Sequence, residues 1–552
     1  MSGTRSGGTQ GSGTQGSGGV AVAERPADAG TVFPDDPRYQ ELTVGFNQRW
    51  VGRPDYVRLA TTTGEVVRAV QEAVDTGRQL SVVSGGHCLA PFVFNEEVRV
   101  VIDLSGLDGV SFDPRRRAFA VGAGARLGQV YETLYKRWGV TVPGGMCPTV
   151  GVGGHVTGGG YGFLSRRFGA VVDHLEAVEV VVVDGSGTAR AVVASRDPGD
   201  PNRELWWMCA GGGGGNVGVV TRFWFATEGS TDGATGGATD GGTDGATGGA
   251  AGGAAGTDPS GLLPNPPKDV LFSAVGIPWA GLDRDAFARL VGNWCGWYER
   301  HTDPADPATE LSGVASLTHR ASGSVFLLSQ LDATQPGAGE LLDRYLAEVT
   351  AGLGVEAAVA AQPPATLPWL HSVRLIAAAI PAFVNPTLRG ASKSAFCKRG
   401  YSAEQTGAMY DALTRTDVAN PASAVTLAGF VGGQVNAVDP AETAVAHRDS
   451  AFWTLFETQW QDPGADAANV GWLRDLYGAV FARTGGFPGI DDDTDGCYVN
   501  NPDPDITDPA YNRSGIPWHT LYYKDNYQLL QRIKAAYDPH DVFRHAQSVT
   551  AP

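Results

Sequence analysis

The chain has 552 residues, and its 41 Lys and Arg side chains against 59 Asp and Glu side chains give a net charge of −18. With 42% hydrophobic and 18% charged residues, it can bury large cores, and its length predicts two or three domains. The acidic balance excludes nucleic acid as the main partner, because phosphate contacts need clustered Lys and Arg. Glycine, at 77 residues, is about twice as frequent as usual.

The cysteine spacing and the apolar runs exclude further classes of protein. Six cysteines lie far apart without CxxC spacing, so we expect neither a disulfide scaffold nor a metal site. The first 30 residues hold no apolar segment of the signal-peptide kind, and no run of 18 apolar residues occurs. We therefore expect a cytoplasmic protein with no membrane partner.

Two segments are rich in Gly, Ser and Thr. Residues 1–30 are predicted to be a disordered tail, and residues 228–260 a disordered Gly/Thr-rich insertion. In the insertion, the octet TDGATGGA begins at Thr231 and again at Thr243. Repeated Asp-Gly could indicate a calcium-binding β-roll, but the nonapeptide spacing is missing, so a flexible surface insertion is the better interpretation.

Residues 31–227 alternate strand patterns with helix patterns. Apolar runs rich in β-branched residues predict strands, and period-3.6 patterns that end at glycine predict helices. The strands are expected over 80–83, 98–104, 119–124, 178–185 and 217–225, and the helices over 63–77 and 127–139. This is an α+β pattern typical of a nucleotide-binding domain.

Residues 261–500 are predicted to form a second, substrate-binding domain. Helix patterns cover 283–301 and 340–353, and strand patterns cover 325–331 and 423–431. Most of the many aromatic residues are expected in the core, and some could line a substrate cavity. In the remaining segment, 501–552, a further helix is expected over 525–537, before Asp538-Pro539.

Three segments concentrate glycine beside reactive side chains. They read SGGHC over 84–88, PGGMCPTVGVGGHVTGGGYG over 143–162, and GGGGGNVGVVT over 211–221. Such loops expose backbone N–H groups that suit a pyrophosphate. Neither the P-loop template nor the Rossmann template is present, so spacing alone leaves both a dinucleotide site and tight packing open.

Together with the C-terminal text LYYKDNYQLLQRIKAAYDPHDVFRHAQSV, these segments resemble the berberine bridge enzyme-like oxidoreductases. These belong to the p-cresol methylhydroxylase/vanillyl-alcohol oxidase superfamily, and the bacterial antibiotic-tailoring members are the most similar. The resemblance covers almost everything outside the tail and the insertion. It implies a two-domain α+β flavoprotein, with a p-cresol methylhydroxylase-type FAD-binding domain, a substrate domain of antiparallel sheet and helices, and a segment 501–552 that returns to the FAD domain.

The resemblance also implies FAD attached covalently at His87 and Cys147. The position of His87 bonds the 8α-methyl carbon of the flavin, and that of Cys147 bonds ring carbon 6. A neutral imidazole and a thiolate are nucleophiles suited to these bonds. Taken alone, His87 could cap its turn and Cys147 could be a small buried side chain. Further FAD contacts are expected at Ser84, Gly85, Gly86, Cys88, Gly144, Gly145, Val150, Gly151, Gly153, Gly154, His155, Gly158, Gly159, Gly160, Tyr161, Gly215, Asn216, Gly218, Val219, Val220, Asn500 and Asn526.

Val150 bears on the electron acceptor. In members of the family, a valine here leaves room for oxygen at the flavin, whereas a bulkier residue favours dehydrogenases; plain packing is the alternative. The resemblance thus implies an oxidase of secondary metabolism that oxidises a hydroxyl of a glycosylated natural product. O2 would be the acceptor and hydrogen peroxide the product.

The catalytic base departs from the family pattern. Hydride transfer from a carbinol to flavin N5 needs a base for the hydroxyl proton. The bacterial members supply tyrosines from the motifs Tyr-x-Asn-Tyr-Pro-Asp and Tyr-Gly-Gly-x-Val-Asn, which here read YVNNPD from Tyr498 and FVGGQVN from Phe430. Phe430 and Asn501, in place of two tyrosines, are expected to contact the substrate. Tyr498 is the first candidate base and Tyr161 the second, and either phenol would need a cationic or hydrogen-bonding neighbour.

This departure leaves three functions open. The first is the oxidase just described. The second is a related flavoenzyme that catalyses oxidative cyclisation or desaturation of a natural-product scaffold, where such a base is unnecessary. The third is a flavin-carrying protein that binds a ligand without turnover.

Overall fold

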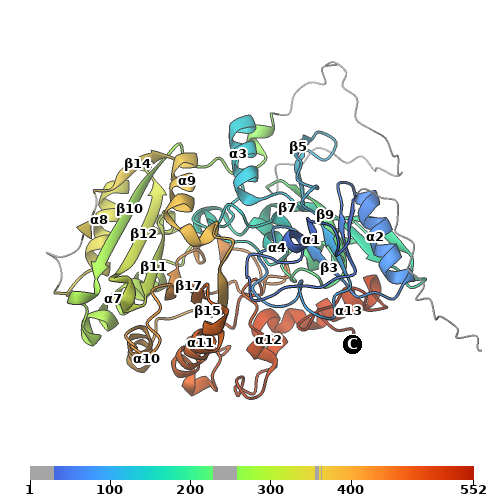
Figure 1. The fold of residues 1–552 in the computed structure, drawn as a ribbon. Coiled ribbons are helices and arrows are strands. Elements are labelled where there is room, and N and C mark those ends of the chain that lie inside the picture. Colours follow the sequence, from blue (N-terminus) through green and yellow to red (C-terminus); the bar gives the residue numbers. More distant parts are fainter. Residues whose placement is uncertain (1–29, 228–257, 355–359, 362) are drawn as a thin grey trace, which may run out of the picture.

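The computed structural model describes residues 30–227, 258–354, 360–361 and 363–552. Within these ranges the chain forms three β-sheets (Figure 1). Two belong to the N-terminal half, and the third belongs to the residues that follow the insertion. The predicted α+β class is confirmed.

The first sheet has the order β1-β2-β4-β3, with β2, β4 and β3 parallel and β1 antiparallel to β2. Helix α2 (Thr63–Asp75) connects two of its strands and buries Val66, Ala69, Val70 and Ala73, one face of a 3.6-residue period. The bounds of these strands are β1 (Thr31–Val32), β2 (Tyr56–Leu59), β3 (Leu80–Val83) and β4 (Val100–Asp103).

The second sheet is antiparallel, with the order β5-β6-β9-β7-β8. Its strands are β5 (Val110–Asp113), β6 (Ala118–Gly122), β7 (Leu175–Val183), β8 (Ala189–Ser195) and β9 (Val219–Phe225). Helix α3 ends at Gly139, which has a left-handed φ of 71° as a C-terminal cap requires. The helices of this half are α1 (Tyr39–Leu42), α3 (Leu127–Trp138), α4 (Val152–Thr157), α5 (Ser165–Phe168) and α6 (Arg203–Cys209).

The third sheet is antiparallel, with the order β13-β10-β12-β11-β16-β17-β15, and β14 also pairs with β10. Helices α7, α8, α10 and α11 pack against it (Figure 1). The strands are β10 (Asp269–Pro278), β11 (Ser312–Thr318), β12 (Ser324–Asp332), β13 (Ala360–Ala361), β14 (Ala365–Pro368), β15 (Arg389–Cys397), β16 (Ser423–Ala428) and β17 (Phe452–Trp460). The helices are α7 (Arg284–Arg300), α8 (Ala338–Val349), α9 (Trp369–Ala379), α10 (Ala403–Leu413) and α11 (Asp466–Val480).

Strand β17 alternates strictly between buried and half-buried residues. Phe456 packs on Tyr477 of α11, with ring centroids 5.1 Å apart, so one face of the strand meets the helices. The other face carries Trp453, Leu455, Glu457 and Gln459. This face is available to a ligand.

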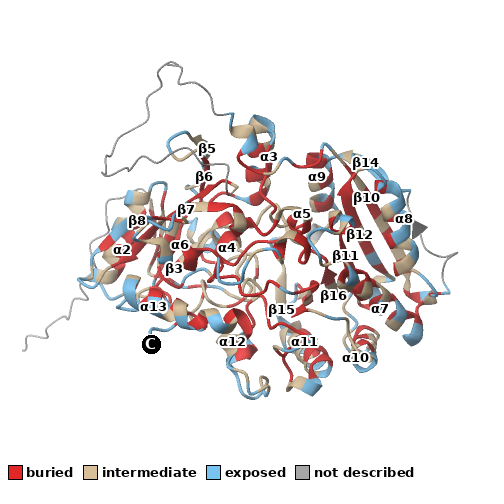
Figure 2. Cartoon of the chain, turned by 180° about the vertical axis from the view of Figure 1, so that it is seen from behind, coloured by how far each residue is buried: buried red, intermediate tan, exposed pale blue. Residues whose placement is uncertain are grey.

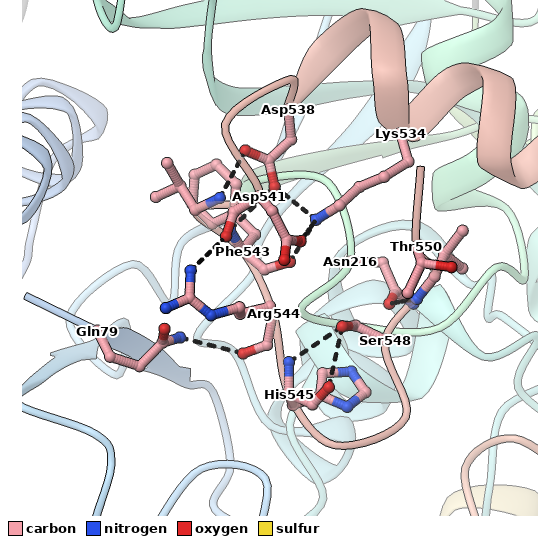
Figure 3. A network of polar contacts seen from close by, with 12 residues as sticks. Gln79, Asn216, Lys534, Asp538, Asp541, Phe543, Arg544, His545, Ser548 and Thr550 are labelled. Atoms are coloured by element: carbon pink, nitrogen blue, oxygen red, sulfur yellow. Dashed lines mark hydrogen bonds and ion pairs between the residues drawn. The ribbon is translucent and has the colours of Figure 1, made fainter. Parts of the chain in front are cut away.

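The C-terminal segment carries α12 (Trp518–Tyr523) and α13 (Tyr527–Tyr537) and lies against the N-terminal half (Figures 1 and 3). The side-chain amide of Gln79 donates to the carbonyl of Arg544 at 3.1 Å. The buried ammonium of Lys534 pairs with Asp538 at 2.6 Å (Figure 3). Pairing offsets the cost of burying that charge, so the turn after α13 has a defined shape.

The buried residues form a continuous interior through both halves (Figure 2). The predicted tail up to residue 29 and the predicted insertion up to residue 257 lie outside the described residues. Residues 258–260 of that insertion are described, and Asp258 caps a short 3-10 helix over Pro259–Gly261. None of the described helices has the length and apolarity needed to cross a bilayer.

Candidate flavin and substrate site

A cavity of about 510 Å³ lies where the three glycine-rich segments, strand β17 and the C-terminal segment meet. Its volume is in the range of small-molecule sites. Its walls are mostly apolar and include residues that are hundreds of positions apart in the sequence. The chain therefore brings its predicted reactive side chains to one place.

Two glycines join the first and second segments. A Cβ atom on Gly85 would lie 2.2 Å from the backbone nitrogen of Gly151, and one on Gly151 would lie 2.2 Å from Ser84 Oγ. Only glycine permits this approach. The Ser84 hydroxyl donates to the carbonyl of Ala123 at 2.6 Å and accepts from the N–H of Gly153 at 3.2 Å. The two segments are thus held in fixed register.

His87 and Cys147 converge on one hydroxyl group. Thr149 Oγ1 lies 3.0 Å from His87 Nε2 and 3.4 Å from Cys147 Sγ. Thr149 donates its own proton to the carbonyl of Phe383 at 2.9 Å. Its lone pairs therefore face His87 and Cys147, and a proton on His87 Nε2 leaves the lone pair on Nδ1.

The imidazole of His87 is neutral at physiological pH. Burial, and to a lesser extent repulsion from Arg126, lower the pKa of His87 to about 4. The ring stacks on Phe46, with centroids 4.5 Å apart. A neutral, oriented imidazole is a competent nucleophile.

The loop that carries Cys147 is clamped from two helices. The N–H of Gly145 donates to His155 Nε2 of α4 at 3.1 Å, and the Tyr131 hydroxyl of α3 donates to the carbonyl of Gly145 at 2.7 Å. Burial lowers the pKa of His155 to about 4, so its ring is a neutral acceptor. These bonds fix the backbone two residues before Cys147.

The third segment meets the C-terminal residues. Asn216 donates to the carbonyl of Gly212 at 2.8 Å and accepts from the N–H of Val549 at 2.9 Å. His545 stacks on Phe92, with centroids 4.2 Å apart, beside the carbonyl of Gly214. Backbone groups from both ends of the chain therefore border this part of the cavity.

Tyr161 and Tyr498 lie together at an aromatic end of the cavity. Their ring centroids are 5.3 Å apart, and Trp453 lies 5.9 Å from Tyr498 and 6.5 Å from Phe430. The side chain of Asn500 donates to the Tyr498 hydroxyl at 3.3 Å. We call the cluster of Tyr161, Phe430, Trp453 and Tyr498 the aromatic end.

Neither phenol is ionised at neutral pH. Burial raises the pKa of Tyr498 to about 12, although the hydrogen bond from Asn500 lowers it somewhat. Burial raises the pKa of Tyr161 still further, against a smaller opposing effect of Arg448. The cationic neighbour that would lower the pKa of Tyr498 is not found among the described residues.

Most of the sequence-predicted cofactor residues line the cavity, but five do not. The predicted residues that line it are Ser84, Gly85, Gly86, His87, Cys88, Gly145, Cys147, Val150, Gly151, Gly153, Gly154, His155, Tyr161, Gly215, Asn216, Gly218, Val219, Val220 and Asn500, together with Phe430, Tyr498 and Asn501. The exceptions are Gly144, Gly158, Gly159, Gly160 and Asn526.

The exceptions have packing roles. A Cβ atom on Gly158 would lie 2.2 Å from the side chain of Asn500, and one on Gly144 would lie 2.5 Å from the Tyr131 hydroxyl. Gly159 and Gly160 have φ values of 110° and 79°, which side chains disfavour. Asn526 donates to the carbonyl of Pro440 at 3.1 Å, away from the cavity.

Sequence reasoning missed the β17 wall and part of the C-terminal segment. Trp453, Leu455, Glu457 and Gln459 line the cavity, as does Gln547. The available signal was weak: residues 452–460 (FWTLFETQW) are rich in aromatic residues and Thr, which favours a strand, but apolar and polar residues do not alternate regularly. Tyr522 and Tyr523 also line the cavity.

The cavity wall offers unused hydrogen-bond acceptors. Asn501 Oδ1 and Gln547 Oε1 are buried and have no hydrogen-bond partner among the described residues. Buried acceptors of this kind are costly unless a ligand pairs with them. Together with the glycine cradle they fit a large ligand rich in N–H and O–H groups, such as FAD. Among the described residues, no group of His, Cys, Asp or Glu is arranged to hold a metal ion.

Two family models match the chain. A model of an FAD-binding domain matches residues 54–189, and a model described as berberine and berberine-like matches residues 497–550. The first covers the His87 and Cys147 segments, and the second covers the C-terminal segment that borders the same cavity.

Whole-chain relatives agree with these matches. The aclacinomycin-N/aclacinomycin-A oxidase of Streptomyces galilaeus is 45% identical over 94% of this chain and 89% of its own length. Among solved structures, CrmK, a flavoenzyme of caerulomycin biosynthesis, has a TM-score of 0.87 at 42% identity, covering 95% of this chain and 99% of its own. A glycopeptide hexose oxidase complexed with teicoplanin has a TM-score of 0.84 at 41% identity, covering 94% and 98%. The chain belongs to the berberine bridge enzyme-like FAD-linked oxidoreductases.

Proposed function

We propose that this protein is an oxidase that carries FAD bonded to His87 and Cys147 and oxidises a hydroxyl group of a glycosylated natural product. The observation that carries the proposal is the convergence of His87 Nε2 and Cys147 Sγ on Thr149 Oγ1, in the wall of the cavity. Two nucleophiles this close can reach two positions on the same edge of a fused ring.

The chain's own residues suit the two bonds. The Nδ1 lone pair of His87 would be free to bond the 8α carbon, and Cys147 Sγ to bond ring carbon 6. Each bond would replace a C–H bond of FAD, and O2 would take the two electrons released. The clamp on Gly145 holds the Cys147 loop in place for this. Bound FAD would supply the hydride acceptor and pass the electrons to O2.

The overall reaction balances as carbinol plus O2 to carbonyl compound plus hydrogen peroxide. In its ionised form, which is a small fraction at neutral pH, Tyr498 takes the hydroxyl proton, and Asn500 holds the phenol in position. Trp453 and Phe430 offer flat faces to an apolar or sugar ring. The side chain of Val150 lies in the cavity wall. Because this side chain is small, it leaves room for O2 to approach the flavin.

The substrate class rests on the relatives and on the cavity. The relatives include an aclacinomycin oxidase and a glycopeptide hexose oxidase complexed with teicoplanin. The mostly apolar wall with a few polar groups suits a bulky scaffold bearing sugars.

The decisive experiment is the intact mass and acid-denatured visible spectrum of the purified protein, followed by peptide mapping. We expect a mass gain of one FAD and flavin on cross-linked peptides that contain His87 and Cys147. Peroxide release with glycosylated antibiotic intermediates then tests the oxidase activity. A colourless protein without adduct would refute the proposal, and flavin that no substrate reduces would favour a ligand-binding protein.

A second candidate function is oxidative cyclisation or desaturation of a natural-product scaffold. It is favoured by Phe430 and Asn501 in the positions of two tyrosines and by the raised pKa of Tyr498, because neither change matters where no hydroxyl proton is removed. Treatment of the product with hydroxylamine separates the two functions. Carbinol oxidation yields a carbonyl that gains an oxime mass, whereas cyclisation and desaturation yield none.

A further inference from the structure

Strand β17 places a carboxyl group in the cavity wall that the reaction described above does not use. The side chain of Glu457 is half-buried and faces the cavity beside Leu455 and Gln459. Its one hydrogen bond among the described residues is from the Thr426 hydroxyl to Oε1, at 3.4 Å. That bond is long, so the carboxyl group remains available to a ligand.

The neighbouring strands offer this carboxyl group no cation. In the sheet register, Ser392 of β15 and Ala424 of β16 lie directly opposite Glu457. The Ser392 hydroxyl is itself buried and has no hydrogen-bond partner within the described ranges. The two strands therefore contribute a small apolar side chain and an unused hydroxyl group.

The positively charged side chains on β15 and on the N-terminal side already have ion-pair or hydrogen-bond partners. On β15, the guanidinium of Arg389 pairs with Asp466 and the ammonium of Lys393 pairs with Asp503. On the N-terminal side, Arg49 donates to the carbonyl of Gly390 at 3.1 Å. The cavity wall also contains His87, whose imidazole is neutral.

Burial without a cation has the expected electrostatic effect. It raises the pKa of Glu457 to about 7, against the smaller opposing effect of the Thr426 hydroxyl. An ionised carboxylate in this wall is costly until a positive charge reaches it. A ligand-borne ammonium group would remove that cost and would also be attracted by the net charge of −18.

The position along the strand separates this carboxyl group from the aromatic end. Trp453, which contacts Tyr498, precedes Glu457 by four residues. At about 3.3 Å per residue, their Cα atoms lie roughly 13 Å apart. Both side chains lie on the same face of β17, so a ligand that spans them would have to be longer than a single ring.

We propose that Glu457, with Gln459 and Ser392 beside it, forms a subsite for a protonated amine of the substrate. The oxidised compound would then carry a basic nitrogen, as an amino sugar does, at a distance from the carbon that is oxidised at the aromatic end. This inference rests on the proposed function for the identity of the reacting end, but the amine subsite itself can be measured without turnover.

The test is anaerobic calorimetric binding of 4-phenylbutylamine and 4-phenyl-1-butanol to the purified full-length holoenzyme at pH 8.5. We expect the amine to bind at least about tenfold more tightly than the alcohol, because it alone can pair with the carboxylate. In E457Q this preference should vanish while the affinity for the alcohol is unchanged, which shows that the cavity is intact. Glu340→Gln, on the exposed face of α8, is the matched control and should keep the preference.

The pH dependence sharpens the test. The amine stays protonated from pH 5.5 to pH 8.5, whereas Glu457 ionises as the pH rises through about 7. The preference for the amine should therefore be absent at pH 5.5 and appear above pH 7. Equal affinities at pH 8.5, no binding of the amine, or a preference that survives in E457Q would each overturn the proposal. Flavin content and peroxide release are measured separately, so failure of the proposed function is recognised independently.

Discussion

The two ends of the cavity are built in different ways. The proposed attachment end, with His87, Cys147 and Thr149, comes from two short segments that are held together by the close contact of Gly85 with Gly151. The β17 wall, with Trp453, Leu455, Glu457 and Gln459, depends on the pairing of a strand with β15 and β16. The first end leaves little freedom to its side chains, whereas the second can change one residue at a time without disturbing the backbone.

This difference suits two separate tasks. The end with His87 and Cys147 fits the chemistry common to the family, and the β17 wall fits the substrate specificity of this chain. The attachment residues stand in the long motifs shared with the family. The departures, Phe430 and Asn501, and the carboxyl group of Glu457 line the rest of the cavity. The predictions below test this division, beginning with the largest effect.

The attachment end is tested by removing its nucleophiles. His87→Ala should keep FAD through Cys147, and Cys147→Ala should keep it through His87, because each bond holds the cofactor alone. The double variant should release all of its flavin on acid precipitation, measured from the visible absorbance of pellet and supernatant. Flavin that stays in the pellet of the double variant would show that the attachment residues are others.

The aromatic end is tested at Tyr498. Tyr498→Phe should lower the rate of flavin reduction by about 10²-fold or more, because it removes the proposed general base. Stopped-flow absorbance under anaerobic conditions measures this rate. Tyr161→Phe, which removes the neighbouring hydroxyl, is the matched control and should have a smaller effect. The reverse order would assign the base to Tyr161.

The contact of Gly85 with Gly151 is tested by Gly151→Ala. The added methyl group would overlap Gly85 and Ser84, so the free energy of unfolding should fall by about 1–3 kcal/mol. Gly154→Ala is the matched control three residues on, because its Cβ would meet no atom within 4 Å. Denaturant titration of both variants checks the difference, and equal stabilities would show that the segments can separate at no cost.

The pH profile distinguishes the two ends by their ionisable groups. With the pKa of Tyr498 raised to about 12, the ionised fraction rises about tenfold per pH unit below that value. The logarithm of the rate of flavin reduction should therefore rise by about one per pH unit from pH 6 to pH 9. In Tyr498→Phe the rate should not depend on pH over this range. A break near pH 7 that persists in Tyr498→Phe and disappears in E457Q would assign proton removal to Glu457.

The α+β class could be predicted because strand and helix signals are local, whereas the convergence of the glycine-rich segments was implied only by the family resemblance. The strand over 80–83 follows from an apolar run rich in β-branched residues, and the helix that begins at Thr63 follows from a period-3.6 pattern that ends at glycine. Gly158 and Gly160 were predicted to contact the cofactor but do not line the cavity, because a glycine needed for packing and one needed for a ligand look alike in sequence. The structure separates them through the side chains of Asn500 and Val171.

The β17 wall could not be predicted because its position depends on long-range pairing. Even if residues 452–460 are taken as a strand, the two-residue period indicates only which residues share a face, not which face meets a cavity. That choice follows from the packing of Phe456 against α11 and from the register with β15. The raised pKa of Tyr498 could not be predicted either, because it results from burial by residues from several segments.

The contacts of residues 543–549 with the N-terminal half impose an order of events during biosynthesis. Phe543, Arg544, His545 and Gln547 line the cavity, and Val549 is bonded to Asn216. These residues are translated after both the glycine-rich segments and the whole third sheet. While they are still in the ribosome, the cavity lacks one wall, so the nascent chain cannot yet enclose a dinucleotide. Cofactor capture should therefore follow the synthesis of residues 543–549.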